Sequence, residues 1–599
     1  MTYQAPIRDF RFVIKELVGL DSLGGGQAGD DLDADMVDAI LDHAAAFYEQ
    51  VLAPTNRSAD LQGAAIADGV VRVPGELGAA YRDYAAAGWG GLRFPTEWGG
   101  QGLPRVLAAA CQEMLNGANL ALGSGTLLCD GAIEALLLTG SPEQRALYLP
   151  KLVSGEWTGA MNLTEPQAGS DLAQIRTRAV KDGDRYRIFG QKLFITFGDH
   201  DMAPNIVHLV LARVAGAPDG IRGLSLFLVP KHLPEPDGTP GPRNDLRAVS
   251  IEHKLGLRAS PTCLMSFGDD GGAVGWLVGE ENRGLDHMFV MMNAARFTVG
   301  MQGIGIAQRA YQLADAYARD RVQSRSPTSR APVAIIEHPD VRRLLMTMAA
   351  QVEAARALAA RLAVWLDLAE THPDDAIRGR YHRLAEYLVP IHKGHHTEMA
   401  VEVASLGIQV HGGVGFTEDC EAAQLYRDAR ILPIYEGTTA IQANDLVGRK
   451  TLRDAGAAAF EAIGLVRDTL DRMQRPDDPD LVDPDLVGMA VSFAPALDAL
   501  DSVVRFLVRR QVADPLTVHA GAVPYLRLAG QVFGGWQMCE AALVARRALA
   551  GGTGDPAFYA RKLAVARFFV DWIAPLAIAA RTSIENADDR YLRLPAEAL

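Results

Sequence analysis

A single glutamate, Glu436, stands in the stretch of the chain best suited to proton transfer, YRDARILPIYEGTTAIQ at positions 426–442. Apolar neighbours such as Tyr435 desolvate a carboxyl group, which raises its pKa and makes it a stronger base. A helix expected to begin at Thr438 or Thr439 acts in the opposite direction, because its positive dipole end favours the anion. The sequence leaves both directions open, and Glu436 is either a general base or a structural residue of the turn before that helix.

Two other segments suit the binding of a flat, phosphorylated cofactor. The loop LTEPQAGSD at 163–171 gathers hydroxyl groups, a glycine and backbone N–H groups, which can bind phosphates or a polar ring edge. Phe194 and Thr196 follow in the segment FIT, where an aromatic ring and a hydroxyl could face such a ring. An ordinary polar turn and an ordinary strand end are the alternatives.

Two further patterns favour structural roles. The glycine-rich run QVHGGVGF at 409–416 is not a dinucleotide fingerprint, since Glu418 stands where the third glycine would be, and a helix stop explains it. Zinc sites need a closed shell of ligands, so we predict a solvated or dimer-contact face, and no metal, at four residues whose spacing on a helix resembles such a site. Those residues are His392, His395, His396 and Glu398.

Composition disfavours several classes of protein. The 599 residues carry a net charge of −15, which argues against nucleic acid and anionic membranes as main partners. Five cysteines without a Cys-x-x-Cys pair fit a reducing compartment. The N-terminus has no signal-peptide core, and no uncharged run has the length of a membrane helix. We therefore expect a cytoplasmic protein without a membrane span.

The pattern of apolar residues predicts a mainly α-helical protein with an antiparallel β domain in the middle. Helical periodicity fills the N-terminal part, short alternating strands follow, and long amphipathic helices return as a bundle. The predicted units are an N-terminal segment and linker at 1–35, a helical domain at 36–155, a β domain at 156–280, a helical-bundle domain with Glu436 at 281–475, and an additional helical domain at 480–599.

Taken together, TEPQAGSD, FIT, HGGVGF and RDARILPIYEGTTAIQ, in this order, resemble the signatures of the acyl-CoA dehydrogenase family over about residues 36–450. The resemblance implies a helical domain, a β-barrel-like domain and a four-helix bundle, with FAD between them. It implies that Glu436 takes the α-proton of an acyl-CoA thioester while the β-hydrogen leaves as hydride to flavin N5, giving a trans-2-enoyl-CoA. The developing negative charge on the thioester carbonyl needs hydrogen-bond donors, which in the family include the backbone N–H of the base.

The resemblance also implies site residues, position by position. The cofactor contacts are Met161, Leu163, Thr164, Gly169, Ser170, Phe194, Ile195, Thr196, Arg321, Gln323, Gln409, Gly412, Gly413 and Thr438. The substrate contacts are Ser170, Asn293, Arg296 and Gly437. Arg321 and the loop from Gln409 to Gly413 would reach the FAD of the partner subunit.

The chain departs from the family pattern at several positions. Phe194 stands where tryptophan is usual, Ser324-Arg325 replaces an aromatic-glycine pair, an extra stretch precedes His338, and Ala440 replaces a common polar residue. The N-terminal YQAPIRDFRFV and the unit after 480 are similar to a longer bacterial subgroup. That similarity implies 3-(methylthio)propanoyl-CoA or a fatty acyl-CoA as substrate, and a homodimer, with the extra unit replacing one dimer of the usual tetramer.

Three functions compete at this point. The first is an acyl-CoA dehydrogenase that passes electrons to an electron-transfer flavoprotein, and the second is an acyl-CoA oxidase of the same fold. The third is a non-catalytic flavoprotein that binds nucleic acid. Residues 451–599 hold 16 Arg and Lys against 19 Asp and Glu, and Glu436 is present, so both observations disfavour the third.

Overall fold

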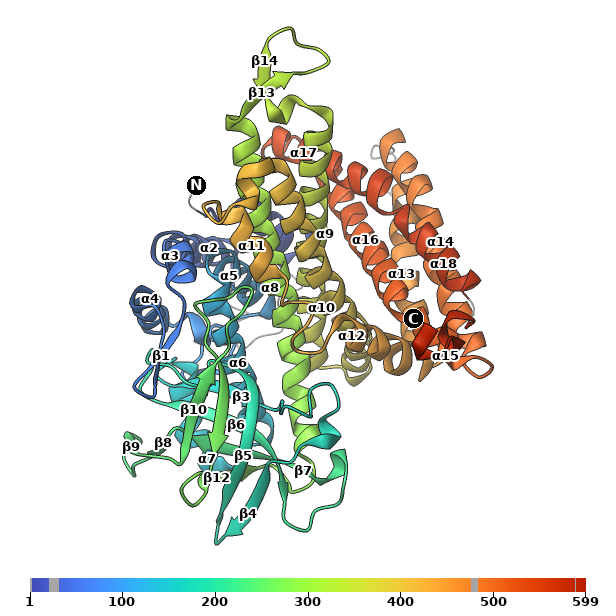
Figure 1. Cartoon of the computed structure of the whole chain (residues 1–599). Coiled ribbons are helices and arrows are strands. Elements are labelled where there is room, and N and C mark those ends of the chain that lie inside the picture. The colour runs from blue at the N-terminus through green and yellow to red at the C-terminus, as the bar shows by residue number, and fades with distance from the viewer. Residues whose placement is uncertain (1–2, 21–31, 476–482, 588, 599) are drawn as a thin grey trace.

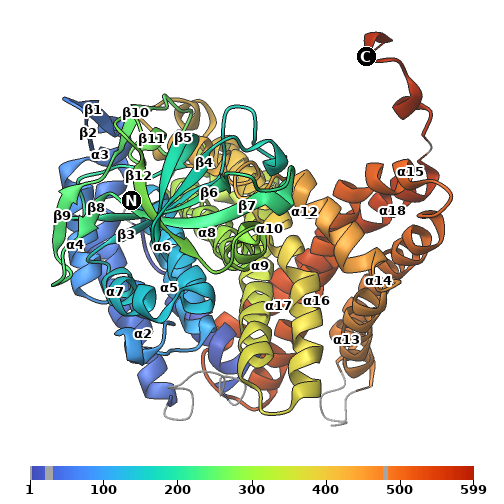
Figure 2. The same cartoon turned by 90° about the horizontal axis from the view of Figure 1, so that it is seen from below.

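The computed structural model describes residues 3–20, 32–475, 483–587 and 589–598. Figure 1 shows an upright set of long helices, a β-sheet below them and a group of C-terminal helices along one side. In Figure 2, seen from below, the last residues of the chain project away from the body. Most of the expected linker, at 21–31, and the proline-rich stretch at 476–482 lie outside the described residues.

The N-terminal part is helical, as its periodicity predicts. Ser141 caps a helix with Pro142 at its first position, and Gln144 completes a capping box with Ser141. Asp33 accepts a hydrogen bond from the Met36 amide and caps the first long helix. The elements are α1 (Ile7–Arg11), η1 (Phe12–Leu17), α2 (Ala34–Phe47), α3 (Thr55–Gln62), β1 (Ala65–Ala67), β2 (Val70–Arg72), α4 (Gly75–Ala86), α5 (Arg105–Ala118), α6 (Leu120–Thr139) and α7 (Pro142–Val153).

The middle of the chain forms one main sheet in the order β10-β11-β5-β12-β7-β6-β3, with β4 paired to β5 and β6. Strands β4 and β5 form an antiparallel hairpin around Asp182-Gly183-Asp184. The strands are β3 (Thr158–Asn162), β4 (Arg178–Asp182), β5 (Arg185–Thr196), β6 (Ile206–Val214), β7 (Leu224–Pro230), β10 (Leu246–Ile251), β11 (Thr262–Phe267) and β12 (Ala273–Val278), with β8 (His232–Pro234) and β9 (Pro240–Arg243) as a separate pair.

The sheet is antiparallel apart from two pairs, which corrects the expectation of purely antiparallel pairing in this domain. β3 pairs with β6 in parallel, and so does β4. Parallel neighbours need a crossover connection, which is usually a helix. Here the β4–β5 hairpin, which belongs to the same sheet, provides the return path between β3 and β6.

Three long helices form the bundle: α8 (Gly284–Asp320), α9 (Pro339–Thr371) and α10 (Asp375–His411). Helices α8 and α10 pack closely and run in the same direction. A Cβ at Gly300 would meet the His392 ring, and a Cβ at Gly303, one turn further on, would meet the carbonyl of His396. The extra stretch before His338 forms a hairpin at the top of Figure 1, made of β13 (Val322–Arg325) and β14 (Pro332–Ala334). Helices α11 (Glu421–Ala429) and α12 (Thr439–Asp445) complete this part.

The C-terminal helices pack against the bundle through α16, which contacts α9, α10 and α12. They are α13 (Ala457–Gln474), α14 (Pro484–Arg510), α15 (Pro515–Ala520), α16 (Ala522–Ala550), α17 (Pro556–Phe568) and α18 (Leu576–Asn586). The N-terminal segment joins them, since the buried Lys562 of α17 donates to Asp9 and to Glu353. Helix α13 contacts α14, α16 and α10, and the division near 475–480 stays a prediction.

Three described helices are long and apolar enough to cross a membrane by length and composition: Leu120–Thr139, Pro484–Arg510 and Pro556–Asn586. In the first, 72% of the apolar window is buried inside the protein, where α6 packs against α8 and β3. Packing inside a large domain therefore accounts for its composition. The expected absence of a membrane span stays a prediction.

Candidate active site

Glu436 lies on a tight turn between α11 and α12. Its backbone φ is +52°, a left-handed value that is uncommon for a residue with a side chain, and Gly437 follows at +87°. A Cβ at Gly437 would come within 2.7 Å of Gln442 Nε2, so glycine suits this position for space as well as for conformation. Thr438 caps α12 by accepting a hydrogen bond from the Ile441 amide at 3.3 Å. The sharp turn expected from the sequence is therefore present.

The carboxyl group of Glu436 is partly buried and flanked by two cations. Burial raises its pKa above the ordinary value, whereas the charges of Lys393 and Arg296 act to lower it. Burial has the largest effect of these three, so the pKa of Glu436 is raised. Arg296, 3% exposed, donates to Asp445 at 2.8 Å and so connects α8 to the end of α12. A carboxylate in this setting is a stronger base than one in water.

The backbone amide of Glu436 donates to no acceptor within the described part of the chain. Buried amides are nearly always paired, so a free N–H beside a partly buried carboxylate points to a ligand acceptor. A thioester oxygen held there would have a donor for the negative charge that forms when its α-proton is removed. This is the donor that the family resemblance implies.

Helix α6 packs beside the Glu436 turn. Leu127 of α6 forms a small apolar cluster with Ala295 and Val299 of α8 and with Tyr435, the residue that precedes the glutamate. The Tyr435 hydroxyl also donates to Gln302 of α8. One side of the carboxyl group is therefore lined by apolar surface, and the Tyr435 hydroxyl beside it is already paired.

The same helix contacts the middle domain. A Cβ at Gly159 of β3 would come within 2.6 Å of Ala132, and a Cβ at Gly125 would come within 3.0 Å of the Phe197 ring. These close approaches fix β3 and the end of β5 against α6. The Glu436 turn and the strands of the middle domain thus share one wall.

The TEPQAGSD loop is held to β5 by a buried ion pair. Glu165 accepts from Lys192 Nζ at 2.9 Å and from the Thr177 hydroxyl at 2.6 Å. Burial acts to raise the pKa of Glu165, but the opposite charge and the hydrogen bonds prevail and lower it to about 2. The loop also pairs directly with β5, through a bond from the Leu193 amide to the Thr164 carbonyl at 2.9 Å. These contacts fix the loop to the strand.

The end of β5 fits a flat aromatic cofactor. Phe194 is 58% exposed although it is aromatic, and its φ is +60°. The register of β5 with β11 shifts at this point, and such bulges re-aim side chains next to active sites. A Cβ at Gly169 would meet no atom within 4 Å, so a ligand can approach that backbone. An exposed ring and an open loop suit the isoalloxazine and the phosphates of FAD.

The other positions expected near the cofactor have mixed surroundings. Ser170 is exposed, whereas Met161 and Ile195 are buried in apolar clusters. The side chain of Asn293 lies outside the described residues. The partly buried positions are Leu163, Thr164 and Thr196.

A second group of expected site residues lies far from Glu436 along the bundle. From Arg296 to Arg321, about 25 residues of helix at 1.5 Å each give a separation of roughly 37 Å. Helix α10 runs parallel to α8 and ends at the same side. The structure therefore does not bring this group to Glu436 of the same chain. Its members, all exposed, are Arg321, Gln323, Gln409, Gly412 and Gly413.

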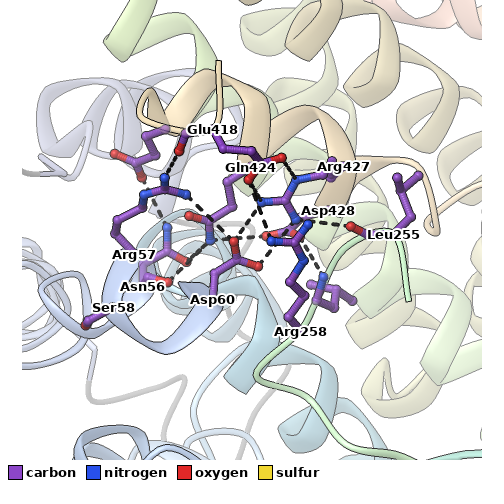
Figure 3. Close-up of polar contacts among 12 residues, drawn as sticks. Asn56, Arg57, Ser58, Asp60, Leu255, Arg258, Glu418, Gln424, Arg427 and Asp428 are labelled. Atoms are coloured by element: carbon purple, nitrogen blue, oxygen red, sulfur yellow. Dashed lines mark hydrogen bonds and ion pairs between the residues drawn. The ribbon is translucent and has the colours of Figure 1, made fainter. Parts of the chain in front are cut away.

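Figure 3 shows a buried polar network that anchors α11, the helix leading into the Glu436 turn. Arg427 donates to Asp60 of α3 at 2.7 Å, and Asp428 accepts from the Leu257 amide at 2.6 Å. Burial, and then the nearby charge of Asp60, raise the pKa of Asp428 to about 7. Segments that are distant in the sequence thus fix the position of α11.

Sequence reasoning missed two buried lysines, Lys393 and Lys192. It placed the three histidines beside Lys393 on a solvated or dimer-contact face, but His392 and His396 are buried within the chain. No group of three or more His, Cys, Asp or Glu side chains among the described residues could hold a metal ion. Nε2 of His392 instead forms a hydrogen bond with the Phe297 carbonyl at 2.8 Å, and burial lowers the pKa of His392 to about 4. The available signal was a lysine within the apolar run LVPIHKG, where a solvated charge is unexpected.

Four family models match the chain in succession. They are the acyl-CoA dehydrogenase N-terminal domain at residues 35–156, the middle domain at 160–269, the C-terminal domain at 282–450, and an acetyl-CoA dehydrogenase C-terminal-like domain at 462–595. The first three span the region that carries the sequence motifs. The fourth covers the extra helical unit.

Curated relatives match over the full length. A 3-methylmercaptopropionyl-CoA dehydrogenase of Ruegeria pomeroyi is 47% identical over 99% of both chains. The broad-specificity linear acyl-CoA dehydrogenase FadE5 of Mycobacterium tuberculosis is 35% identical, also over 99% of both. Among solved structures, Caenorhabditis elegans ACDH-11 in complex with C11-CoA has a TM-score of 0.77 at 21% identity, covering 95% of this chain and 91% of that one, which supports the fold.

Proposed function

This chain belongs to the acyl-CoA dehydrogenase family, and from that membership we propose that Glu436 removes the α-proton of a bound acyl-CoA thioester. The chain is an FAD-dependent acyl-CoA dehydrogenase, an oxidoreductase. One observation carries the role of Glu436. Its carboxylate is partly buried near Lys393 and Arg296, on a turn whose own N–H is unpaired within the described residues.

The residues of this chain divide the work between binding and proton transfer. The Glu436 carboxylate accepts the α-proton, and its backbone N–H donates to the thioester oxygen as negative charge develops there. Phe194, Thr196 and the loop at 163–171 would hold FAD, which when bound supplies the acceptor for the hydride leaving the β-carbon. Tyr435 keeps one side of the base apolar. The product is a trans-2-enoyl-CoA.

For the substrate we propose 3-(methylthio)propanoyl-CoA. The support is the relative from Ruegeria pomeroyi, which is named for that acyl group and is 47% identical over nearly the whole chain. A linear fatty acyl-CoA is the second candidate, supported by the broad-specificity relative at 35% identity. Both substrates present an acidic α-carbon to Glu436, so the role of the base does not depend on the choice.

We propose that the enzyme is a homo-oligomer, with a dimer as its smallest active form. The support is the separation of the two groups of site residues, since roughly 37 Å of helix lies between Arg296 and Arg321. A second chain could bring Arg321 and Gln409 to the FAD of the first. Exposed apolar side chains just beyond α10, Val414 at 52% and Phe416 at 84%, also suit an interface.

The proposal extends to the electron acceptor and the compartment, on the family resemblance and the composition. We propose an electron-transfer flavoprotein as acceptor and the cytoplasm as location. Oxygen uptake coupled to acyl-CoA, without an added acceptor, would instead identify an oxidase. Strong binding of the protein to DNA at physiological salt would instead favour the non-catalytic, nucleic-acid-binding flavoprotein.

The test of the proposed function is anaerobic reduction of the flavin by a panel of acyl-CoA thioesters, with short, long, branched and methylthio-substituted chains. We expect the methylthio substrate to bleach the flavin fastest. Glu436→Gln should leave a yellow, folded protein whose flavin is reduced at least about a hundredfold more slowly, the typical contribution of a general base. Near-normal reduction in that variant would exclude Glu436 as the base.

A further inference from the structure

Lys393 lies directly under the turn that carries Glu436. It belongs to α10 and is 0% exposed. Its ammonium donates to three backbone carbonyls, those of Leu432 at 2.9 Å, Tyr435 at 2.9 Å and Gly437 at 2.6 Å. Three acceptors use all three N–H donors of a protonated lysine. One cation therefore connects both sides of Glu436 to a central helix of the bundle.

The turn needs such a support because its backbone is strained. Glu436 and Gly437 both have positive φ values, and a residue with a side chain keeps this strained conformation only where its surroundings enforce it. Gln442 also contacts the turn, but its Nε2 lies 3.3 Å from the backbone carbonyl oxygen of Glu436 and 3.5 Å from that of Gly437. At Gly437 the ammonium of Lys393 is the closer donor, at 2.6 Å.

Of the two cations that act on Glu436, Lys393 and Arg296, Lys393 is the one without an ion-pair partner among the described residues. Each hydrogen bond of its ammonium ends on a neutral carbonyl. Arg296 of α8, the other nearby cation, forms an ion pair with Asp445 at 2.8 Å. Asp445 in turn pairs with Arg449 at 2.6 Å. From the side of α10, Glu436 therefore faces a positive charge that no ion pair offsets within the described residues.

The remaining ionisable groups around this position do not replace that charge. Glu398 of α10 accepts from the Thr439 hydroxyl at 2.6 Å and faces Arg527 of α16 at 3.6 Å. Burial lowers the pKa of His392 to about 4, so its ring is neutral near neutral pH. Burial raises the pKa of Tyr435, which therefore stays protonated.

We propose that Lys393 is a positioning residue of the active site, which holds the Glu436 turn by its carbonyls and keeps the carboxylate ionised once substrate displaces water. The inference rests on the proposed role of Glu436 as the base. It explains how a carboxyl group from which water is expelled remains able to accept a proton, because desolvation alone favours its protonated form. The electrostatics agree in direction, since Lys393 lowers the pKa of Glu436.

Each of the two charges shifts the pKa of the other group. Burial lowers the pKa of Lys393 to about 7, and the Glu436 carboxylate acts against that shift. The positive charge is therefore present on the acidic side of neutrality, where the base has to ionise. Removing it must shift the acidic limb of the rate profile toward higher pH, because Glu436 then holds its proton more tightly.

The experiment measures flavin reduction by a saturating acyl-CoA between about pH 5 and about pH 9 in stopped flow, with the FAD-loaded full-length enzyme. Lys393→Gln and Lys393→Met remove the charge, and Lys393→Arg keeps it. Lys562→Met is the matched control, a buried lysine of α17 that pairs with Asp9 and Glu353. Each variant that retains FAD is titrated.

We expect the neutral variants to move the acidic limb upward by about one pH unit, which is roughly a tenfold lower rate at a fixed pH on that limb. Lys393→Arg should keep the limb in place with a lower plateau, because a planar guanidinium fits the three carbonyls poorly. Lys562→Met should leave the limb unchanged. Loss of FAD from the neutral variants alone would also support a requirement for charge.

A limb that coincides with that of the wild type in either neutral variant overturns the proposal. Loss of FAD from all three Lys393 variants overturns its electrostatic part, since shape would then be limiting. A failure of the proposed function looks different: the wild-type flavin would not be reduced by any acyl-CoA, and no limb would exist to compare.

Discussion

Two lysines of the active site, Lys192 and Lys393, are both 0% exposed, yet their charges are compensated in different ways. Lys192 of β5 forms an ion pair with Glu165 at 2.9 Å. Lys393 of α10 donates to three carbonyls instead, and the carboxylate that responds most to its charge is that of Glu436. Burial lowers both pKa values, to about 8 for Lys192 and to about 7 for Lys393.

The difference separates a structural charge from a functional one. The charge of Lys192 is neutralised locally, so it stabilises the cofactor loop without acting at a distance. The charge of Lys393 is left to act on Glu436, although a buried charge without an ion-pair partner is the more costly of the two. The partner of a buried charge, rather than its burial, decides what the charge does.

The largest effect should come from breaking the Lys192 pair. Lys192→Met leaves the buried Glu165 carboxylate without its cation, and breaking a buried ion pair typically costs about 3–5 kcal/mol, so we expect FAD loss and a large fall in the urea midpoint. Lys192→Met with Glu165→Gln removes both charges and should recover more than half of the loss. FAD content and urea unfolding measure both variants. Full FAD content in Lys192→Met alone would contradict the structural role.

A double-mutant cycle sharpens the comparison at Lys393. At about pH 6, Lys393→Gln should slow flavin reduction by roughly tenfold in the wild-type background. In the Glu436→Gln background the same change should cost less than about threefold, because the neutral amide does not respond to the charge. Single-turnover rates of the four proteins give the coupling. Equal effects in both backgrounds would show that Lys393 acts only on the shape of the turn.

The smallest effect is expected at Asp428, a buried acid that lies beside a second acid, Asp60. Burial and the charge of Asp60 raise the pKa of Asp428 from 3.8 to about 7. An acid with a raised folded pKa stabilises the protein fully below its unfolded pKa, and this contribution is lost as pH rises through about 7. Asp428→Asn should remove that loss and gain about 1 kcal/mol at alkaline pH.

Urea unfolding of the wild type and of Asp428→Asn at about pH 5 and about pH 8 measures this effect. The stability contributed by Glu165 changes with pH in the opposite direction. Its pKa is lowered from 4.5 to about 2, so its contribution is lost only as pH falls toward that value. If the two proteins lose stability equally between the two pH values, Asp428 is already ionised in the folded state.

Much of the fold follows from local pattern. The Ser141 cap, the hairpin turn at Gly183 and the long bundle helices are each encoded within neighbouring residues, because caps, turns and helical periodicity act over a few positions. The order of the motifs also identified the family. The roles of the individual site residues stay predictions that the experiments above address.

Other features depend on residues that meet only after folding. The parallel pairing of β3 with β6 needs the hairpin between them to return across the same sheet. The separation of Arg321 from Arg296 follows from the unbroken length of α8. A lysine in an apolar run has no identifiable partner until α10 packs beneath the turn at Glu436, and so Lys393 could not be recognised in advance.

The sequence alone determined which carboxyl group could serve as the base and which loops could hold a flavin, because those choices depend on residue type and order. Tertiary structure decided how the carboxyl group is charged. Desolvation and Coulomb interactions depend on distances in space, and the lysine that lies under Glu436 comes from a helix 43 residues earlier in the chain.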